Sequence, residues 1–177
     1  IVTKCPLTIT PMEQRGIERT LSLYPWQKLY FSYFRYGDLY PLFNKELPAL
    51  SLDSLSKQKF NIMLLTGIAS PQQLEYDIRK YAEFKPLHFS DHHNFSTKDF
   101  KLIEDTFDSL PKENRIVITT EKDSARLYAG GLKEEIAKAM YVLPIEVNFM
   151  NDKAEEFNQI ITGYVHKNSR NSTLLKE

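Results

Sequence analysis

Short apolar runs that alternate with well-marked helix starts constrain the fold of this chain more than any other feature. The runs have the length of buried strands: "NIMLLTGIA" at 61–69, "FKPLHF" at 84–89, "RIVITT" at 115–120 and "MYVLPIEV" at 140–147. A helical stretch follows each of them. Strands that alternate with helices in this way predict a mainly parallel sheet with helices on both faces.

The helix starts carry the signature of N-terminal caps, a Ser or Thr followed three residues later by an acidic or amide side chain. They are "TPME" at 10–13, "SPQQ" at 70–73, "STKD" at 96–99 and "TEKD" at 120–123. Apolar residues with helical spacing follow, for example Phe100, Ile103 and Phe107. We therefore expect residues from about 60 to 166 to form a three-layer α/β/α, Rossmann-like domain.

Residues before this unit do not fit inside it, and we place a domain boundary near residue 46. The segment "YPWQKLYFSYFRYGDLYPLF" at 24–43 is dense in aromatic residues and alternates as in a sheet. It suits strands that link two domains, and the alternative is an aromatic surface facing a lipid or ligand. Because the chain opens "IVTKCP" without a methionine, we also expect a fragment whose first 46 residues are the remnant of a preceding domain.

Composition excludes several classes of partner. Lys plus Arg and Asp plus Glu are balanced at 23 each, so no long-range field attracts the chain to nucleic acid. The single cysteine, Cys5, cannot form an internal disulfide, which suits a reducing compartment. No apolar run reaches the length of a membrane span, about 18 residues. We expect a soluble, cytoplasmic chain.

The loop "SDHHNFS" at 90–96 is the strongest candidate for chemistry, because ligands of open parallel sheets bind where strands end and helices begin. Histidine exchanges a proton near neutral pH, and the carboxylate of Asp91 could orient an imidazole beside it. Neighbouring loop residues point in different directions, so one of His92 and His93 faces the cleft while the other packs or caps. The alternative is a polar helix entrance on a non-catalytic α/β binding module.

Metal chemistry is a further alternative, since Asp-His-His also occurs in two-metal phosphoesterases. Such sites need more carboxylates or histidines from other strand ends, and His88 and His166 are isolated. We expect no metal site held by this chain alone. Its six glycines form neither a G-x-x-x-x-G-K-[ST] nor a G-x-G-x-x-G motif, so no nucleotide-binding loop is predicted.

A second polar cluster, "TTEKDSARL" at 119–127, also follows a strand. Its simplest interpretation is structural, with Thr120 and Asp123 capping a helix and Lys122 in solvent. Its place at a strand end also allows a role in binding.

Together, "LLTGIASP", "FSDHHNFS" and "VITTEKDSARL" resemble the C-terminal half of the tetraacyldisaccharide 4'-kinase (lipid A 4'-kinase) family. The opening "IVTKCP" and "LYFSYFRYGDLYPLF" are similar to the family's middle region. The resemblance implies that residues 1–46 are the C-terminal remnant of a P-loop nucleotide-binding kinase domain with inter-domain strands. Residues 47–177 would then be the C-terminal α/β/α domain with the DHH loop.

The resemblance also implies an activity. The family transfers the γ-phosphate of ATP, with Mg²⁺, to the 4'-hydroxyl of a tetraacylated glucosamine disaccharide 1-phosphate in lipid A and lipopolysaccharide biosynthesis. ATP and Mg²⁺ would be bound mainly by an N-terminal half that this sequence lacks, so the fragment itself is expected to be inactive. The full-length protein would lie peripherally on the cytoplasmic side of the bacterial inner membrane.

The same resemblance implies roles for individual residues. His92, which directly follows the aspartate, would help to deprotonate the sugar hydroxyl together with an acidic residue outside this chain. Asp91 would orient its ring. We place His93, Lys122, Asp123 and Thr120 as candidates for substrate binding or domain closure, and we expect no cofactor or metal ligand in this chain.

Overall fold

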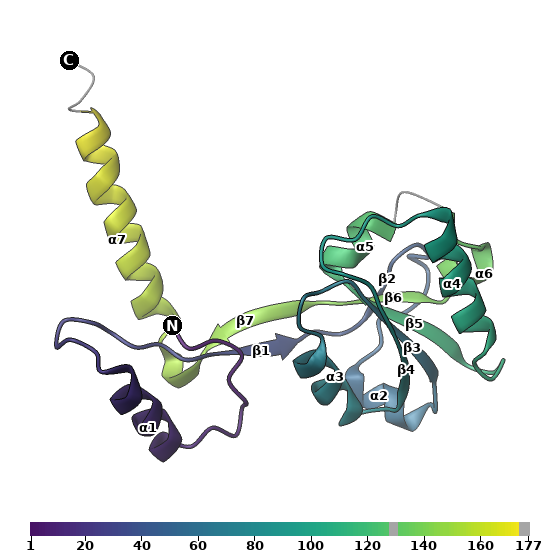
Figure 1. Cartoon of the computed structure of the whole chain (residues 1–177), viewed down its shortest axis with the longest axis horizontal. Coiled ribbons are helices and arrows are strands. Elements are labelled where there is room, and N and C mark those ends of the chain that lie inside the picture. Colours follow the sequence, from purple (N-terminus) through teal and green to yellow (C-terminus); the bar gives the residue numbers. More distant parts are fainter. Residues whose placement is uncertain (128–130, 174–177) are drawn as a thin grey trace. The chain divides into compact units, whose positions relative to one another are not determined.

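A computed structural model describes residues 1–127 and 131–173, with side chains up to residue 168. The chain divides into two compact units (Figure 1). One is formed by Ile1–Arg35 with the described part of Glu146–Glu177, and the other by the described residues of Tyr36–Ile145. Among the described residues, every helix is too short or too polar to span a bilayer.

The larger unit is built on a five-stranded sheet with the order β2-β6-β5-β3-β4. Its strands are β2 (Tyr40–Pro41), β3 (Asn61–Thr66), β4 (Phe84–His88), β5 (Arg115–Thr120) and β6 (Met140–Leu143). β3 pairs in parallel with β4 and β5, β5 pairs in parallel with β6, and β2 is antiparallel at the edge. The predicted mainly parallel sheet is confirmed.

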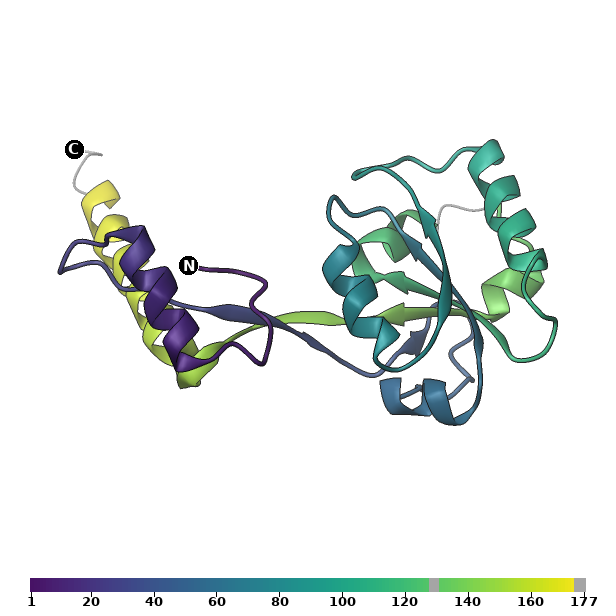
Figure 2. The ribbon, with the colours of Figure 1, turned by 60° about the horizontal axis from the view of Figure 1, so that its bottom comes forward.

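Helices cover both faces of this sheet (Figure 2). They are α2 (Leu52–Lys57), α3 (Gln72–Arg79), α4 (Thr97–Asp108), α5 (Glu121–Leu127) and α6 (Glu134–Lys138). Side chains alternate along β3: Ile62 and Leu64 pack with the residues of α2 and α3, whereas Met63 and Leu65 pack with those of α4, α5 and α6. Two cores thus lie on opposite faces of the sheet, which gives the expected three-layer α/β/α fold.

Two local expectations differ from the structure. The run at 140–147 is two strands, because Pro144 has no backbone N–H for a ladder and separates β6 from β7 (Ile145–Phe149). The prediction that Ser70 caps α3 is wrong, since the N-cap residue is Pro71 and no side chain caps this helix. The capping box at Ser96 and Asp99 is present as predicted.

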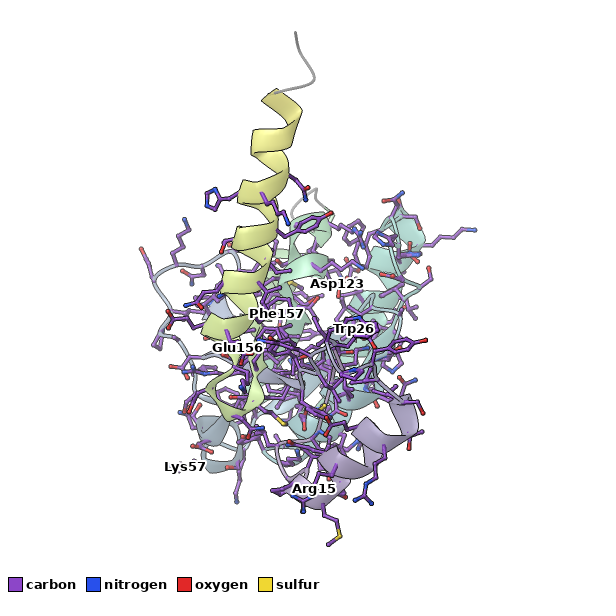
Figure 3. The ribbon with its side chains drawn as sticks, turned by 90° about the vertical axis from the view of Figure 1, so that its left-hand side faces the viewer. Arg15, Trp26, Lys57, Asp123, Glu156 and Phe157 are labelled. Atoms are coloured by element: carbon purple, nitrogen blue, oxygen red, sulfur yellow. The ribbon has the colours of Figure 1, made fainter. Side chains whose placement is uncertain are left out.

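The smaller unit contains α1 (Pro11–Leu21), all but the last residue of β1 (Ser32–Tyr36), all but the first residue of β7, the 3₁₀ turn η1 (Met150–Asp152) and α7 (Ala154–Thr173). β1 and β7 form a two-stranded sheet. The ring of Tyr30 packs edge-on against Phe149 and Phe157, with centroids 6.0 and 5.3 Å away. Lys28 Nζ lies 2.7 Å from Glu156 Oε1, and Figure 3 shows Glu156 and Phe157 near the start of α7.

The two units divide the chain at other positions than the boundary expected near residue 46. Residues 36–46 belong to the α/β unit, because β2 extends its sheet and because Leu39 and Leu42 are buried in its cores. The described residues from Glu146 onward belong instead with the N-terminal segment.

Candidate functional site

The candidate site lies where the loops after β3, β4 and β5 meet at the carboxyl edge of the parallel sheet. Asp91, His92 and His93 follow β4, and Lys122 and Arg126 project from α5, which begins directly after β5. Hydrogen bonds between α5 side chains and Gly67, Asp91 and His92 join these loops. The structure therefore brings together two polar segments that the sequence separates by about thirty residues.

Asp91 is the centre of the exposed part of the site. Its Oδ1 accepts hydrogen bonds from Lys122 Nζ and, at 3.0 Å, from the backbone N–H of His92. The hydrogen bond from Lys122 is the main cause that lowers the pKa of Asp91, and the hydrogen bond from the backbone N–H of His92 adds a smaller contribution. Asp91 is therefore an ionised carboxylate at neutral pH.

His92 is the more exposed of the two histidines in this loop. Its side chain is 74% exposed, and its Nε2 lies 3.6 Å from Asp91 Oδ2. On the other side of the ring, Nδ1 lies 3.0 Å from Arg126 Nη2. The backbone of His92 has a φ of 58°, in the left-handed region that non-glycine residues seldom occupy. Such conformations cluster at functional loops, where the surroundings hold them.

His93 packs into the loop. Its ring stacks on Phe89 with centroids 4.9 Å apart and meets Phe95 edge-on at 5.5 Å. Its Nε2 lies 3.0 Å from Oδ2 of Asp99. The same oxygen accepts hydrogen bonds from the backbone N–H and hydroxyl of Ser96 at 2.7 and 2.6 Å. His93 thus connects the loop to the capping box of α4.

The side chains of Thr120 and Asp123 are buried below this surface. Oδ2 of Asp123, which is 1% exposed, accepts hydrogen bonds from Thr120 Oγ1 at 2.7 Å and from the backbone N–H of Gly67 at 2.9 Å. The backbone N–H of Asp123 donates to Thr120 Oγ1 at 3.2 Å, which is the predicted cap of α5. These contacts hold the loop after β3 against α5.

The sequence reasoning missed Arg126. The available signal was weak: Arg126 follows Lys122 by four residues on a helix that starts at a strand end, so both side chains lie on one face. Lys122 reaches Asp91 and Arg126 reaches His92, so α5 holds both residues of the loop.

A second group of polar contacts, between Thr66, His88 and Glu75, was also not predicted from the sequence. Thr66 Oγ1 lies 3.0 Å from His88 Nδ1, and His88 Nε2 lies 2.7 Å from Glu75 Oε1. His88 is thus held between the end of β3 and α3. It is not part of the cluster around Asp91.

The arrangement does not gather the ligand set that a two-metal phosphoesterase needs. His93 contacts Asp99, whereas Asp91 and His92 contact basic side chains. In the two described ranges, no group of three or more His, Cys, Asp and Glu side chains could hold a metal ion.

Comparison with known proteins decides the family. A family model described as tetraacyldisaccharide-1-P 4'-kinase matches residues 32–165. The chain belongs to the tetraacyldisaccharide 4'-kinase family. The resemblance inferred from the three motifs is therefore confirmed.

Similar proteins agree with this assignment. The chain is 51% identical over 174 residues to the tetraacyldisaccharide 4'-kinase of Phocaeicola vulgatus, covering 97% of this chain and 47% of that protein. It is 42% identical over 182 residues to the enzyme of the same name from Bacteroides thetaiotaomicron, covering 98% and 47%. The chain thus spans about half the length of these relatives.

One solved structure is also similar, that of LpxK from Aquifex aeolicus in complex with ATP. It is 16% identical, with a TM-score of 0.44, and the match covers 80% of this chain and 38% of that one.

Proposed function

We propose that this chain is the C-terminal part of a kinase that transfers the γ-phosphate of ATP to the 4'-hydroxyl of tetraacyldisaccharide 1-phosphate in lipid A biosynthesis. The family match carries this proposal, because it covers residues 32–165 and includes the whole DHH loop. The exposed imidazole of His92, beside the ionised Asp91 and two basic side chains, is the group in this chain that faces the glycolipid.

The chemistry of phosphoryl transfer suits such a site. The reaction asks the protein chiefly to position the attacking hydroxyl and to stabilise charge. His92 handles the proton of the sugar hydroxyl together with an acidic residue outside this chain, and Asp91 and Lys122 hold the loop. His93 supports the loop from within. Thr120 and Asp123 hold the loop after β3 against α5, which carries Lys122, so their contribution to substrate binding or closure is indirect.

ATP and Mg²⁺ belong in this proposal to the other half of the full-length kinase. The sequence has no phosphate-binding loop, and the described residues gather no carboxylate set that suits Mg²⁺. We therefore assign no residue of this chain to either. Residues 1–46 were expected to be the remnant of that nucleotide-binding domain with inter-domain strands. Because residues 36–46 belong to the α/β unit, only residues 1–35 remain candidates for this remnant. The full-length kinase would meet its glycolipid at the cytoplasmic surface of the inner membrane.

The test uses a full-length kinase that contains this sequence as its C-terminal half. With Mg²⁺ and ATP, it should phosphorylate tetraacyldisaccharide 1-phosphate, whereas the 177-residue chain alone should show neither turnover nor tight MgATP binding by calorimetry. A full-length protein that binds both substrates without phosphoryl transfer would overturn the proposal. Micromolar MgATP affinity of the chain alone would refute the placement of the nucleotide site.

A further inference from the structure

The contact between Arg126 and His92 decides which nitrogen of the imidazole carries the proton. Arg126 Nη2 lies 3.0 Å from His92 Nδ1. A guanidinium has only N–H donors and stays protonated in proteins, so it cannot accept a hydrogen bond. Nδ1 must therefore accept the bond and carry no proton. In a neutral imidazole the proton then sits on Nε2.

The surroundings of the other ring nitrogen, Nε2, agree with this assignment. Nε2 of His92 lies 3.6 Å from Oδ2 of Asp91, which is longer than a hydrogen bond, but the nearby carboxylate favours a donor at this nitrogen. The other neutral tautomer would place an N–H on Nδ1 against the guanidinium, and two donors would face each other without an acceptor. Of the two neutral tautomers, the one with its proton on Nε2 gives the guanidinium an acceptor and places the N–H on the side of Asp91.

Arg126 is placed to impose this form. It lies on α5, four residues after Lys122, whose ammonium holds Asp91. Its Nη1 is buried and has no hydrogen-bond partner among the described residues, so part of the guanidinium is enclosed by the protein. The helix thus fixes the cation on one side of the ring and the carboxylate on the other.

We propose that Arg126 is a positioning residue that selects, for the neutral imidazole of His92, the tautomer with its proton on Nε2. The atom that His92 presents to a bound molecule is then a hydrogen-bond donor. It suits an acceptor such as a carboxylate or phosphate oxygen. In this tautomer Nε2 cannot take up a proton, because the only free lone pair is on Nδ1, which faces Arg126. The functional meaning of this assignment depends on the proposed kinase activity, but the tautomer itself does not.

Nitrogen-15 NMR of the histidine rings in the 177-residue chain tests the assignment above pH 7.5, where neutral rings give distinct shifts for protonated and unprotonated nitrogens. We expect His92 to show a protonated Nε2 and an unprotonated Nδ1. In Arg126→Met the two shifts should move toward each other, because the ring then exchanges between tautomers. Arg126→Lys, which keeps a cationic donor, should restore at least part of the separation.

Two results would overturn the proposal: a proton on Nδ1 of His92 in the unaltered chain, or identical His92 shifts in the unaltered chain and Arg126→Met. The first needs no variant, so it holds even if Arg126→Met fails to fold. The His166 ring on α7 serves as an internal reference, since its shifts should not change. Because no kinase assay enters, an inactive full-length protein would leave the tautomer assignment standing.

Discussion

The carboxyl group of Asp123 accepts a hydrogen bond from the backbone N–H of Gly67 at 2.9 Å, and this contact ties the loop after β3 to α5. The acceptor atom, Oδ2 of Asp123, also accepts a hydrogen bond from the hydroxyl of Thr120. α5 in turn carries Lys122 and Arg126 to Asp91 and His92. The position of the exposed loop at residues 90–96 therefore depends, through α5, on this buried hydrogen-bond network.

Asp123→Ala should destabilise the chain by about 2–4 kcal/mol, because it leaves the buried Gly67 N–H and Thr120 hydroxyl without their acceptor. Urea unfolding followed by circular dichroism measures this as a lower midpoint. The matched control is Asp105→Ala on α4, which removes only an exposed ion pair with Lys101 and should change stability by less than about 1 kcal/mol. Equal midpoints for the two variants would contradict the network.

Gly67 is close-packed against this network, so an added methyl group should disturb it. A Cβ at Gly67 would lie 2.8 Å from Asp123 Oδ1 and 3.4 Å from the carbonyl oxygen of Ser90. Gly67→Ala should therefore cost about 1–3 kcal/mol, the usual range for overpacking. In Gly16→Ala the new methyl group meets nothing within 4 Å. Gly16 lies inside α1, where the higher helix propensity of alanine should stabilise the chain by about 0.5–1 kcal/mol. The two variants should therefore shift the midpoint of thermal unfolding in opposite directions. Destabilisation by both would show that local crowding is not the cause.

The parts of this fold that the sequence predicts are those with local causes. The apolar runs of β3 and β5 and the capping box of α4 follow from neighbouring residues, so they appear where they were expected. The break at Pro144 also has a local cause, and the apolar character of the run concealed it. The grouping of the ends of the chain into one unit depends on pairing of β1 with β7, which no local pattern reveals.

The candidate site likewise has features with local causes, which the sequence predicts, and features that depend on the folded structure. Its place at a strand end follows from the sequence, because parallel strands deliver their loops to one edge. Which histidine is exposed does not follow, since it depends on the stacking of His93 on Phe89 and on the left-handed backbone of His92. The partner of His92 also escaped prediction, because a contact between residues 92 and 126 exists only after the sheet has formed.

Asp99 should make the stability of the chain depend on pH in a defined window. Hydrogen bonds from the side chain and backbone of Ser96, with a smaller contribution from His93, lower the pKa of Asp99 to about 2. In an unfolded chain the pKa of an aspartate is about 3.9. Because the folded value is the lower one, the stabilisation is fully present above about pH 4 and is lost as the pH falls through 2.

Asp99→Asn removes this titration. The difference in urea midpoint between the unaltered chain and Asp99→Asn should therefore be largest above pH 5 and should shrink as the pH falls from about 4 toward 2. The midpoints of both proteins, measured at half-unit steps between pH 2.5 and 6, give this difference directly. Parallel curves across the whole window would show that Asp99 does not carry the effect.

His92 should matter to turnover in the full-length kinase and little to nucleotide binding. His92→Ala is expected to lower kcat by about 100-fold or more with a small change in the KM for ATP, because the ring acts on the sugar hydroxyl. His92→Asn is the informative companion, since asparagine tolerates the left-handed backbone and keeps a side-chain N–H donor but cannot take up a proton. If His92 acts as a donor, Asn should recover a measurable part of the lost kcat. If it acts as a base, both variants should be equally slow. Lys101→Ala, an exposed change on α4, controls for surface effects, and near-normal turnover of His92→Ala would remove the residue from the reaction.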